Sequence, residues 1–170
     1  MRVILCGQVA VEGTERPVPA GRAQHALAYL AAHRPQAVRR EALIDALWPR
    51  DPPRDPRAVL NSLVSRLRRS LGAKAIEGGA TLRLALPPGS SVDVEEAEAA
   101  IGEATAARAA ERWQAAWEHA SVARDIAERG FLPEFESPWI DERRAEVETL
   151  LLDAEHLTCS GALLLDFALM

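Results

Sequence analysis

One amphipathic segment, residues 55–72, constrains the fold of this chain more than any other stretch. Its apolar side chains recur at the spacing of a single helical stripe, and Gly72 follows where such a helix would end. The residues of the stripe are Leu60, Val64, Leu67 and Leu71. The other side carries amide, hydroxyl and guanidinium groups. The segment therefore predicts a helix that is anchored on one side and presents a basic polar face, either to a DNA groove or to solvent.

The residues at the start of the chain predict a small antiparallel sheet. Val3–Cys6 is a short run that favours a strand, and Glu12–Glu15 is typical of a turn. Arg16–Pro19 then completes the pair as a short return strand, whose two prolines suit a sheet edge.

Two helices and a hairpin surround the amphipathic segment. Apolar spacing predicts helices over residues 22–33 and 39–48. After the segment, residues 75–86 contain two strand-like runs around a Gly-Gly turn, which predicts a projecting hairpin. A sheet, three helices and a hairpin in this order predict an α+β winged helix-turn-helix with an N-terminal antiparallel sheet.

A turn-forming stretch, residues 87–91, marks the best domain boundary. We therefore expect a winged-helix domain over residues 1–88 and an all-α domain over residues 92–170. The charge changes sign at this point, since residues 1–92 hold 14 Lys and Arg against 7 Asp and Glu, whereas residues 93–170 hold 6 against 18. This asymmetry favours a nucleic-acid-binding module joined to a partner-binding module, or an acidic surface that only aids solubility.

The second half has the pattern of a helical unit. Residues 93–109 and 111–129 predict two helices, and residues 139–156 begin a third that can run further. Ser91 or Asp93 is expected to cap the first of them.

The loop between the second and third of these helices, residues 130–138, is too apolar to float in solvent, so we expect it to pack against the helices. Three tryptophans of this half are expected to lie in the core rather than in a ligand groove, since they follow helical spacing. They are Trp113, Trp117 and Trp139.

Several motifs also carry a family resemblance. EALIDALWP at residues 41–49, the proline-rich loop after it and VSRLRRSLG at residues 64–72 resemble the DNA-binding domain of the Streptomyces antibiotic regulatory protein (SARP) family, a branch of OmpR-like winged helices. Residues 92–127 and 130–157 resemble the start of the TPR-like bacterial transcriptional activator domain of that family. Family members continue with further helices, so the apolar segment Gly161–Met170 implies either a fragment of a longer regulator or a helical half that packs against a second copy.

The resemblance makes residues 57–71 the recognition helix in the major groove and residues 75–86 the wing. Base edges are then expected to meet Asn61, Ser62, Ser65 and Arg68, and phosphates to meet Arg57, Arg66 and Arg69. The DNA backbone or minor groove is expected to meet Arg39 and Arg40, at the start of the second helix, and Thr81 and Arg83, on the wing. Leu63 stands where the family often has histidine or tyrosine and is expected to join the core, and Leu82 is expected to fill a tyrosine slot of the family's wing as an apolar plug.

The sequence carries no sign of an enzyme. Its four histidines pair with no cysteine or carboxylate at metal-ligand spacing, and nucleotide-binding glycine motifs are absent, so we expect no cofactor and no metal. Cys6 and Cys159 lie in apolar contexts and are expected to be buried thiols in a reducing compartment. With neither a signal peptide nor a long apolar run, the chain is expected in the cytoplasm without membrane contact.

These features predict a sequence-specific DNA-binding transcriptional regulator that acts as an activator. Its main partner would be double-stranded operator DNA, and the family's direct repeats imply neighbouring copies on that DNA. The stiff loop at residues 51–56 either contacts RNA polymerase or is only a rigid connector, and the helical domain suits self-association. The alternative is a winged-helix and helical adaptor that binds proteins without specific DNA binding.

Overall fold

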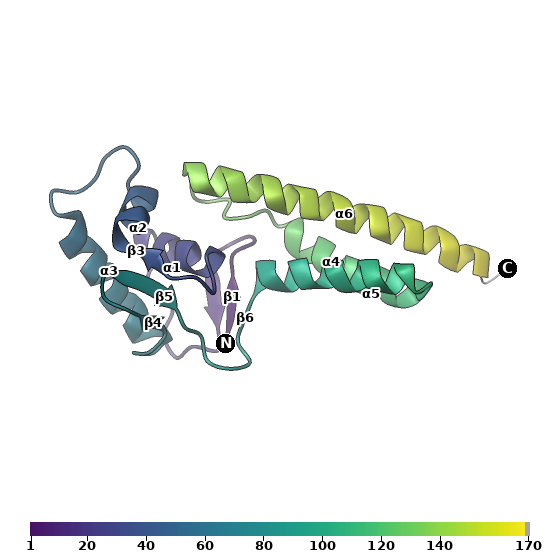
Figure 1. The fold of residues 1–170 in the computed structure, drawn as a ribbon, viewed down its shortest axis with the longest axis horizontal. Helices are drawn as coiled ribbons and strands as arrows, with labels where there is room; N and C mark the ends of the chain where they lie inside the picture. The colour runs from purple at the N-terminus through teal and green to yellow at the C-terminus, as the bar shows by residue number, and fades with distance from the viewer. Residues whose placement is uncertain (169–170) are drawn as a thin grey trace.

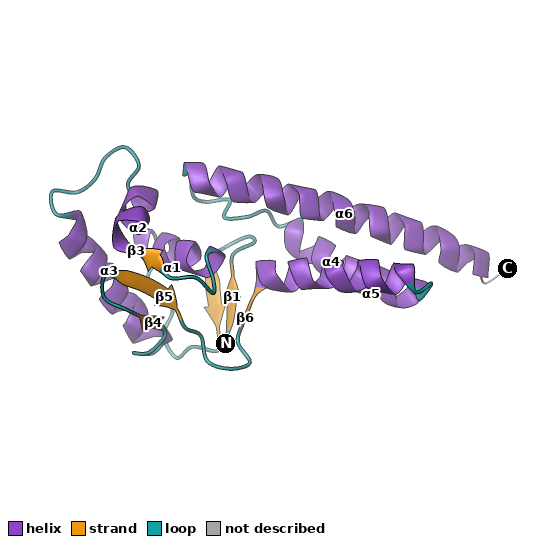
Figure 2. Cartoon of the chain, viewed as in Figure 1, coloured by secondary structure: helices purple, strands orange, loops and turns teal. Residues whose placement is uncertain are grey.

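The computed structural model describes the backbone of residues 1–168 and the side chains of residues 1–159. Two small sheets and three helices form the N-terminal half, and three further helices extend away from it (Figures 1 and 2). The architecture is an α+β winged helix followed by a helical unit, as the sequence predicts.

The first sheet has β1 (Arg2–Ile4) as its central strand. β1 pairs antiparallel with β2 (Ala10–Glu12), where Val3 lies opposite Val11, and parallel with β6 (Ser91–Val92). The prediction of a purely antiparallel sheet is therefore wrong for one strand. Strand β6 arrives only after the wing and enters the sheet alongside β1.

The predicted return strand at Arg16–Pro19 is absent. Pro17 and Pro19 have no amide hydrogen with which to extend a strand ladder. The carbonyl oxygen of Pro17 instead accepts a hydrogen bond of 3.0 Å from the Ser70 hydroxyl, so this loop is fastened to the third helix.

Three helices pack around the core of the N-terminal half. They are α1 (Arg22–Ala32), α2 (Arg40–Leu47) and α3 (Pro56–Leu71). Leu27, Leu43 and Leu60 contribute one fully buried side chain from each helix. The apolar stripe predicted for residues 55–72 faces this core, and Leu63 joins it as expected. The second helix begins one residue later than predicted, since Arg39 belongs to a strand.

The second sheet contains the wing. Its order is β3 (Val38–Arg39), β5 (Thr81–Leu84) and β4 (Ile76–Glu77), and both pairings are antiparallel. Gly78 turns the chain between β4 and β5 with φ of 110°, and a Cβ atom there would lie 2.0 Å from the carbonyl oxygen of Thr81. The wing is thus a short hairpin whose turn accepts only glycine at its first position, and Leu82 is buried behind it as expected.

The helical half is built from α4 (Asp93–Ala109), α5 (Trp113–Ala127) and α6 (Pro138–Ala168), which lie side by side (Figure 1). Small side chains make most of the buried face of α5, including Ala116, Ala120 and Ala123. The predicted tryptophan core is wrong for two of three residues, because helices that pack through alanine leave bulky rings at the rim. Trp113 is half-buried, and Trp117 is 37% exposed.

Asp93 fastens the two halves together. The prediction that Asp93 or Ser91 caps α4 is wrong, since no side chain caps this helix. Asp93 is instead the first residue of α4 and is fully buried. Its carboxylate accepts hydrogen bonds from the backbone N–H groups of Leu5 (2.8 Å) and Cys6 (3.0 Å). Burial raises the pKa of this carboxyl, although the backbone N–H donors oppose that rise.

The apolar loop after α5 is packed against α6, as predicted, through hydrogen bonds from Arg144 to its carbonyls, and it also meets the residues that follow β1. Phe131 and Leu132 are buried, and the amide of Leu132 donates to the carbonyl of Leu5 at 3.0 Å. The amide of Gly7 donates to the carbonyl of Gly130 at 2.8 Å. The loop therefore forms an isolated antiparallel bridge, Cys6 with Phe131, just beyond the end of β1.

The first turn of α6 contacts the winged helix directly. The Ser137 hydroxyl, just before α6, donates to the carbonyl of Ala46 at 3.1 Å. One hydrophobic core runs through both halves, from Val3 to Ala154. The domain limits at residues 88 and 92 consequently stay a prediction.

Two predictions concern the C-terminal region. The side chains of the apolar segment Gly161–Met170 lie outside the described residues. Cys6 is buried as predicted, whereas Cys159 is exposed, which contradicts its expected burial. Within the part of the chain that the structure describes, no helix combines the length and apolar character needed to cross a bilayer.

Candidate nucleic-acid interface

Helix α3 begins and ends at well-defined signals. The Asp55 carboxylate accepts a hydrogen bond of 3.0 Å from the amide of Ala58, and Pro56 occupies the first turn, where no amide donor is needed. At the other end Gly72 has φ of 108°, a conformation that favours glycine. The helix lies at the end of the molecule that is farthest from the last turns of α6 (Figure 1).

The outward face of α3 is polar and basic. Asn61, Ser62, Ser65, Arg66 and Arg69 are all exposed, whereas every leucine of the helix is buried. Asn61 and Ser65 are one turn apart on the side that faces the wing, while Arg66 lies on the opposite side. The structure therefore brings the predicted base-edge side chains together on one surface, with the exception of Arg68.

Arg68 faces the wing. Its Nε donates a hydrogen bond of 2.9 Å to the carbonyl oxygen of Ile76 on β4, and the side chain is only partly exposed. Sequence periodicity predicts Arg68 in the row of Asn61 and Ser65, but its guanidinium donates to a backbone carbonyl of the wing. In this structure Arg68 thus links α3 to the wing, and its predicted contact with bases stays a prediction.

Arg40 connects three parts of the interface. Its Nε donates to the carbonyl oxygen of Gly79 in the wing turn, and its backbone N–H donates to the carbonyl oxygen of Ala80. One terminal nitrogen of the same guanidinium donates to Oδ1 of Asn61 at 2.8 Å. Arg40 was predicted as a phosphate contact, yet its hydrogen bonds are made within the protein.

Two other predicted arginines sit in exposed ion pairs. Arg57 pairs with Glu41 of α2 at 3.1 Å, and Arg83 pairs at 2.6 Å with Glu77, directly opposite on the wing. Such pairs contribute little stability and open readily in water. Both arginines remain available to a phosphate.

Arg39 and Thr81 lie on the wing sheet. They are opposite each other in the β3–β5 pairing, and both are exposed. Among the described residues, neither Arg39 nor Arg66 has a hydrogen-bond or ion-pair partner, so these two guanidinium groups are the least committed of the predicted set.

A cationic groove beside α3 was missed at the level of sequence. Arg16 lies with Arg66 and Arg69 around a shallow groove of about 410 Å³, bordered by Pro17 and Ser70. The hydrogen bond between the Ser70 hydroxyl and Pro17 brings the N-terminal loop there. No spacing rule links residue 16 to residue 66, so only the fold reveals this cluster of three arginines.

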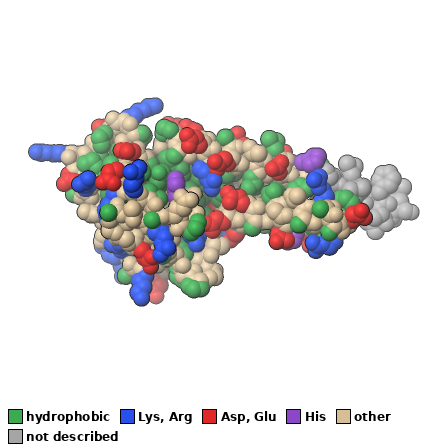
Figure 3. All heavy atoms as spheres, viewed as in Figure 1, with side chains coloured by type: hydrophobic (Ala, Val, Ile, Leu, Met, Phe, Trp, Pro, Cys, Tyr) green, Lys and Arg blue, Asp and Glu red, His purple; other side chains and the backbone are tan. Residues whose placement is uncertain are grey.

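The charge asymmetry of the sequence is visible on the surface. On the face drawn in Figure 3, Lys and Arg side chains gather mainly over the winged-helix half, and Asp and Glu side chains extend along the helical half. Positive charge is thus concentrated in the winged-helix half and negative charge in the helical half, a distribution that favours approach of a polyanion to the α3 end.

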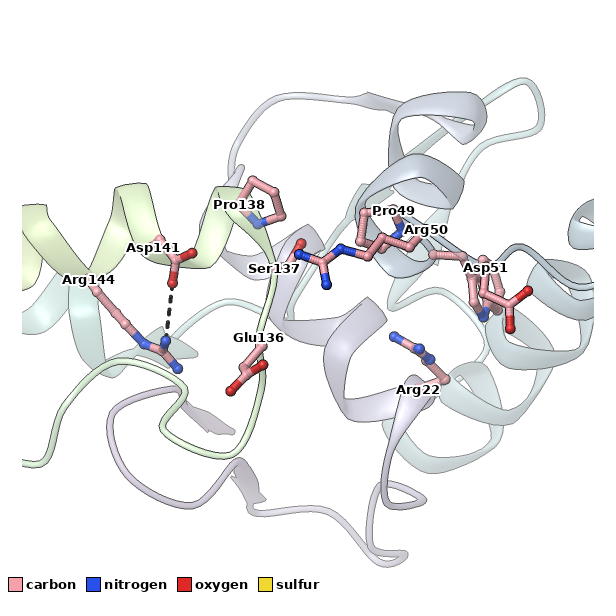
Figure 4. Close-up of a pocket in the computed structure, with 10 residues that line it drawn as sticks. Arg22, Pro49, Arg50, Asp51, Glu136, Ser137, Pro138, Asp141 and Arg144 are labelled. Atoms are coloured by element: carbon pink, nitrogen blue, oxygen red, sulfur yellow. Dashed lines mark hydrogen bonds and ion pairs between the residues drawn. The ribbon is translucent and has the colours of Figure 1, made fainter.

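A mixed-charge groove lies where the two halves meet. It has a volume of about 730 Å³ and runs between the ends of α1 and α2 and the start of α6 (Figure 4). Arg144 on one wall donates to the carbonyls of Leu132 (2.7 Å) and Phe135 (2.6 Å) and pairs with Asp141. Arg22 on the other wall donates to the carbonyl of Leu47. Each of these two arginines is bound within its own half, Arg22 to the end of α2 and Arg144 to the loop before α6, so neither is a free ligand for an anion.

The one histidine buried between the two halves in the described structure is His25, and it packs there as part of the core. His25 on α1 is buried, and burial beside Arg22 lowers its pKa to about 4. No group of His, Cys, Asp and Glu side chains in the described part of the chain is arranged to hold a metal ion.

Comparison with known proteins relates both halves to transcriptional regulators. Residues 19–81 match the family described as "Transcriptional regulatory protein, C terminal". The transcriptional regulatory protein EmbR, of Mycobacterium tuberculosis and of Mycobacterium bovis, is 36% identical over 146 residues, which cover 81% of this chain and 35% of EmbR. The chain therefore spans about a third of the length of these relatives.

A solved structure shares the whole arrangement. Mycobacterium tuberculosis EmbR in complex with a low affinity phosphopeptide superposes with a TM-score of 0.84 and 25% identity, over 95% of this chain and 45% of that chain. The likeness includes the winged helix and the three helices that follow.

Proposed function

We propose that this protein is a sequence-specific DNA-binding transcriptional activator. Residues 19–81 belong to the transcriptional regulatory protein C-terminal family, and the chain is a homologue of EmbR, a SARP-family regulator. It would insert α3 into the major groove and place the β4–β5 wing against the backbone or minor groove, with residues 1–88 as the DNA-binding domain and residues 92–170 as the start of the activator domain. Its place of action would be the cytoplasm, where bacterial DNA lies.

The observation that carries this proposal is the division of α3 into two faces. All of its leucines are buried, and the helix is fixed at its start by Asp55, near its end by Arg68 and Ser70, and along its side by Arg40. A helix held this firmly can offer Asn61, Ser62 and Ser65 to base edges with little loss of conformational freedom.

The cations of the interface supply the sequence-independent part of binding. Arg16, Arg66 and Arg69 on one side of α3 and Arg39 on the other would neutralise phosphates, and Arg57 could exchange its carboxylate partner for one. Thr81 and Arg83 would add backbone contacts from the wing. Each neutralised phosphate releases counterions, so affinity should fall steeply with salt.

The deciding experiment is selection of bound DNA from a genomic pool by the purified chain, followed by salt titration of the enriched fragments. We expect one enriched motif, repeated in direct orientation if neighbouring copies bind side by side. Recovery of no motif, with binding abolished at physiological salt, would overturn the proposal.

The second candidate function is a protein-binding adaptor. The strongly acidic helical half favours it, because residues 93–170 carry 18 Asp and Glu against 6 Lys and Arg and would repel DNA. The same DNA selection separates the two, since an adaptor would enrich no sequence.

We further propose RNA polymerase as a partner of the loop between α2 and α3. Asp51, Pro52 and Arg54 are exposed there, and the prolines keep the loop stiff. An R54A variant should keep DNA affinity and lose transcriptional activation in a reconstituted assay. Self-association through the helical half remains a parallel proposal, tested by sedimentation of the free protein.

A further inference from the structure

We propose that Arg40 is a positioning residue that orients the side-chain amide of Asn61, so that Asn61 reads guanine in preference to adenine. The inference rests on the proposed function, because it requires α3 to lie in the major groove. Asparagine usually recognises adenine in the major groove. We infer a preference for guanine instead, because the amide oxygen of Asn61 is already bound to Arg40.

The first step is the commitment of the amide oxygen. Oδ1 of Asn61 accepts a charge-assisted hydrogen bond of 2.8 Å from the guanidinium of Arg40. An asparagine that reads adenine needs this oxygen to accept from the N6 amino group while its own NH₂ donates to N7. Arg40 occupies the acceptor and places a positive charge beside it, which disfavours approach of another donor.

The second step concerns the hydrogen-bond donors that the Asn61 amide still has free for a base. Its NH₂ group has two N–H donors, and it points away from the carbonyl that Arg40 holds. Guanine presents two acceptors in the major groove, O6 and N7, whereas adenine presents an acceptor and a donor. The pair Arg40–Asn61 is therefore matched to the guanine edge.

The third step is the rigidity of Arg40 itself. Its backbone N–H and its Nε are bound to consecutive carbonyls of the wing turn, those of Ala80 and Gly79. In the described structure Arg40 has no carboxylate partner that would draw it elsewhere. The planar guanidinium can bridge Gly79 and Asn61 at once, and a lysine ammonium cannot reproduce that fork.

The test compares the DNA motifs selected by the wild type and by Asn61→Ala, Arg40→Lys and the double variant. Asn61→Ala identifies the base position that Asn61 reads, and we expect the wild type to favour guanine over adenine there by about tenfold, within the range of one good base contact. Arg40→Lys keeps the charge and should lose this preference, or invert it toward adenine, at that position alone. In the Asn61→Ala background Arg40→Lys should change no base preference.

Glu41→Ala is the matched control, because Glu41 adjoins Arg40 on α2 and pairs with Arg57 rather than with Asn61. It should leave the preference at the Asn61 position intact, and thermal melts should show all variants folded. An Arg40→Lys motif identical to the wild-type motif would overturn the inference while leaving the proposed function standing. A wild type that selects no motif would overturn both, and adenine at the Asn61 position in the wild type would overturn the inference alone.

Discussion

Nε1 of Trp139 on α6 donates a hydrogen bond of 3.2 Å to Nε2 of His25 on α1, and the two rings stack with centroids 5.7 Å apart. The bond requires His25 to be neutral at Nε2, because a protonated imidazole has no acceptor. A junction between the DNA-binding half and the helical half therefore depends on the protonation state of one buried histidine.

Acid should weaken this junction. The folded pKa of His25, about 4, is below its ordinary 6.5, so the stability gained from the neutral ring is fully present above pH 6.5 and is lost as the pH falls toward 4. We expect a loss of about 2 kcal/mol between pH 7 and pH 5. Urea denaturation across this range measures it, and H25F should flatten the dependence. An unchanged pH profile in H25F would contradict the assignment.

Arg66→Ala should weaken binding to every DNA sequence and lower the salt slope by about 1, because it removes one phosphate contact. Fluorescence anisotropy at several salt concentrations measures the slope. Arg108→Ala is the matched control, since Arg108 is an exposed arginine on α4 and carries the same charge. Equal slopes for the two variants would remove Arg66 from the interface.

Arg68→Ala should act on stability and wing placement rather than on base preference. It deletes the 2.9 Å hydrogen bond to the carbonyl of Ile76, and a partly buried carbonyl that loses its partner costs about 1 kcal/mol. We expect a lower denaturation midpoint, weaker binding and an unchanged selected motif. A motif relaxed at one position would restore Arg68 as a base reader.

Gly78→Ala should distort the wing, whereas Gly79→Ala should not. A Cβ at Gly78 would approach the carbonyl oxygen of Thr81 to 2.0 Å, and no atom lies within 4 Å of a Cβ at Gly79. The strained turn should cost about 1–3 kcal/mol or force the hairpin open. Chemical denaturation and DNA affinity of the two variants, measured together, give the comparison, and equal behaviour would show that the wing turn differs from the one described.

Asp93→Ala should loosen the link between the halves. It leaves the buried amides of Leu5 and Cys6 without acceptors, which we expect to cost about 3 kcal/mol. Glu95→Ala, two residues along α4, removes only an exposed pair with Arg34 and should change stability by less than about 1 kcal/mol. The two free energies of unfolding are measured side by side, and similar values would argue against the buried clamp.

Periodic features of the sequence predicted most of the fold correctly. The stripe along residues 55–72 and the Ala/Glu-rich run at 93–109 gave helices close to the observed bounds, the first because one apolar face must be buried and the second because alanine and glutamate favour helices. The Gly-Gly turn correctly marked the wing, since few residues tolerate its conformation. The site residues stay predictions, but most of them do share one exposed surface.

By itself, the sequence determined the buried stripe of α3 and the distribution of charge, since those follow from spacing and chemistry along one element, whereas it misplaced Trp117 and Cys159, which are exposed. Only the tertiary structure decided what each polar group meets. Arg68 turns to a wing carbonyl, Arg40 holds Asn61, Arg16 joins α3 from the N-terminal loop, and Asp93 accepts from the amides just after β1. Each of these contacts joins two different elements of the fold, and the spacing of residues along one element does not encode which polar groups the fold brings together.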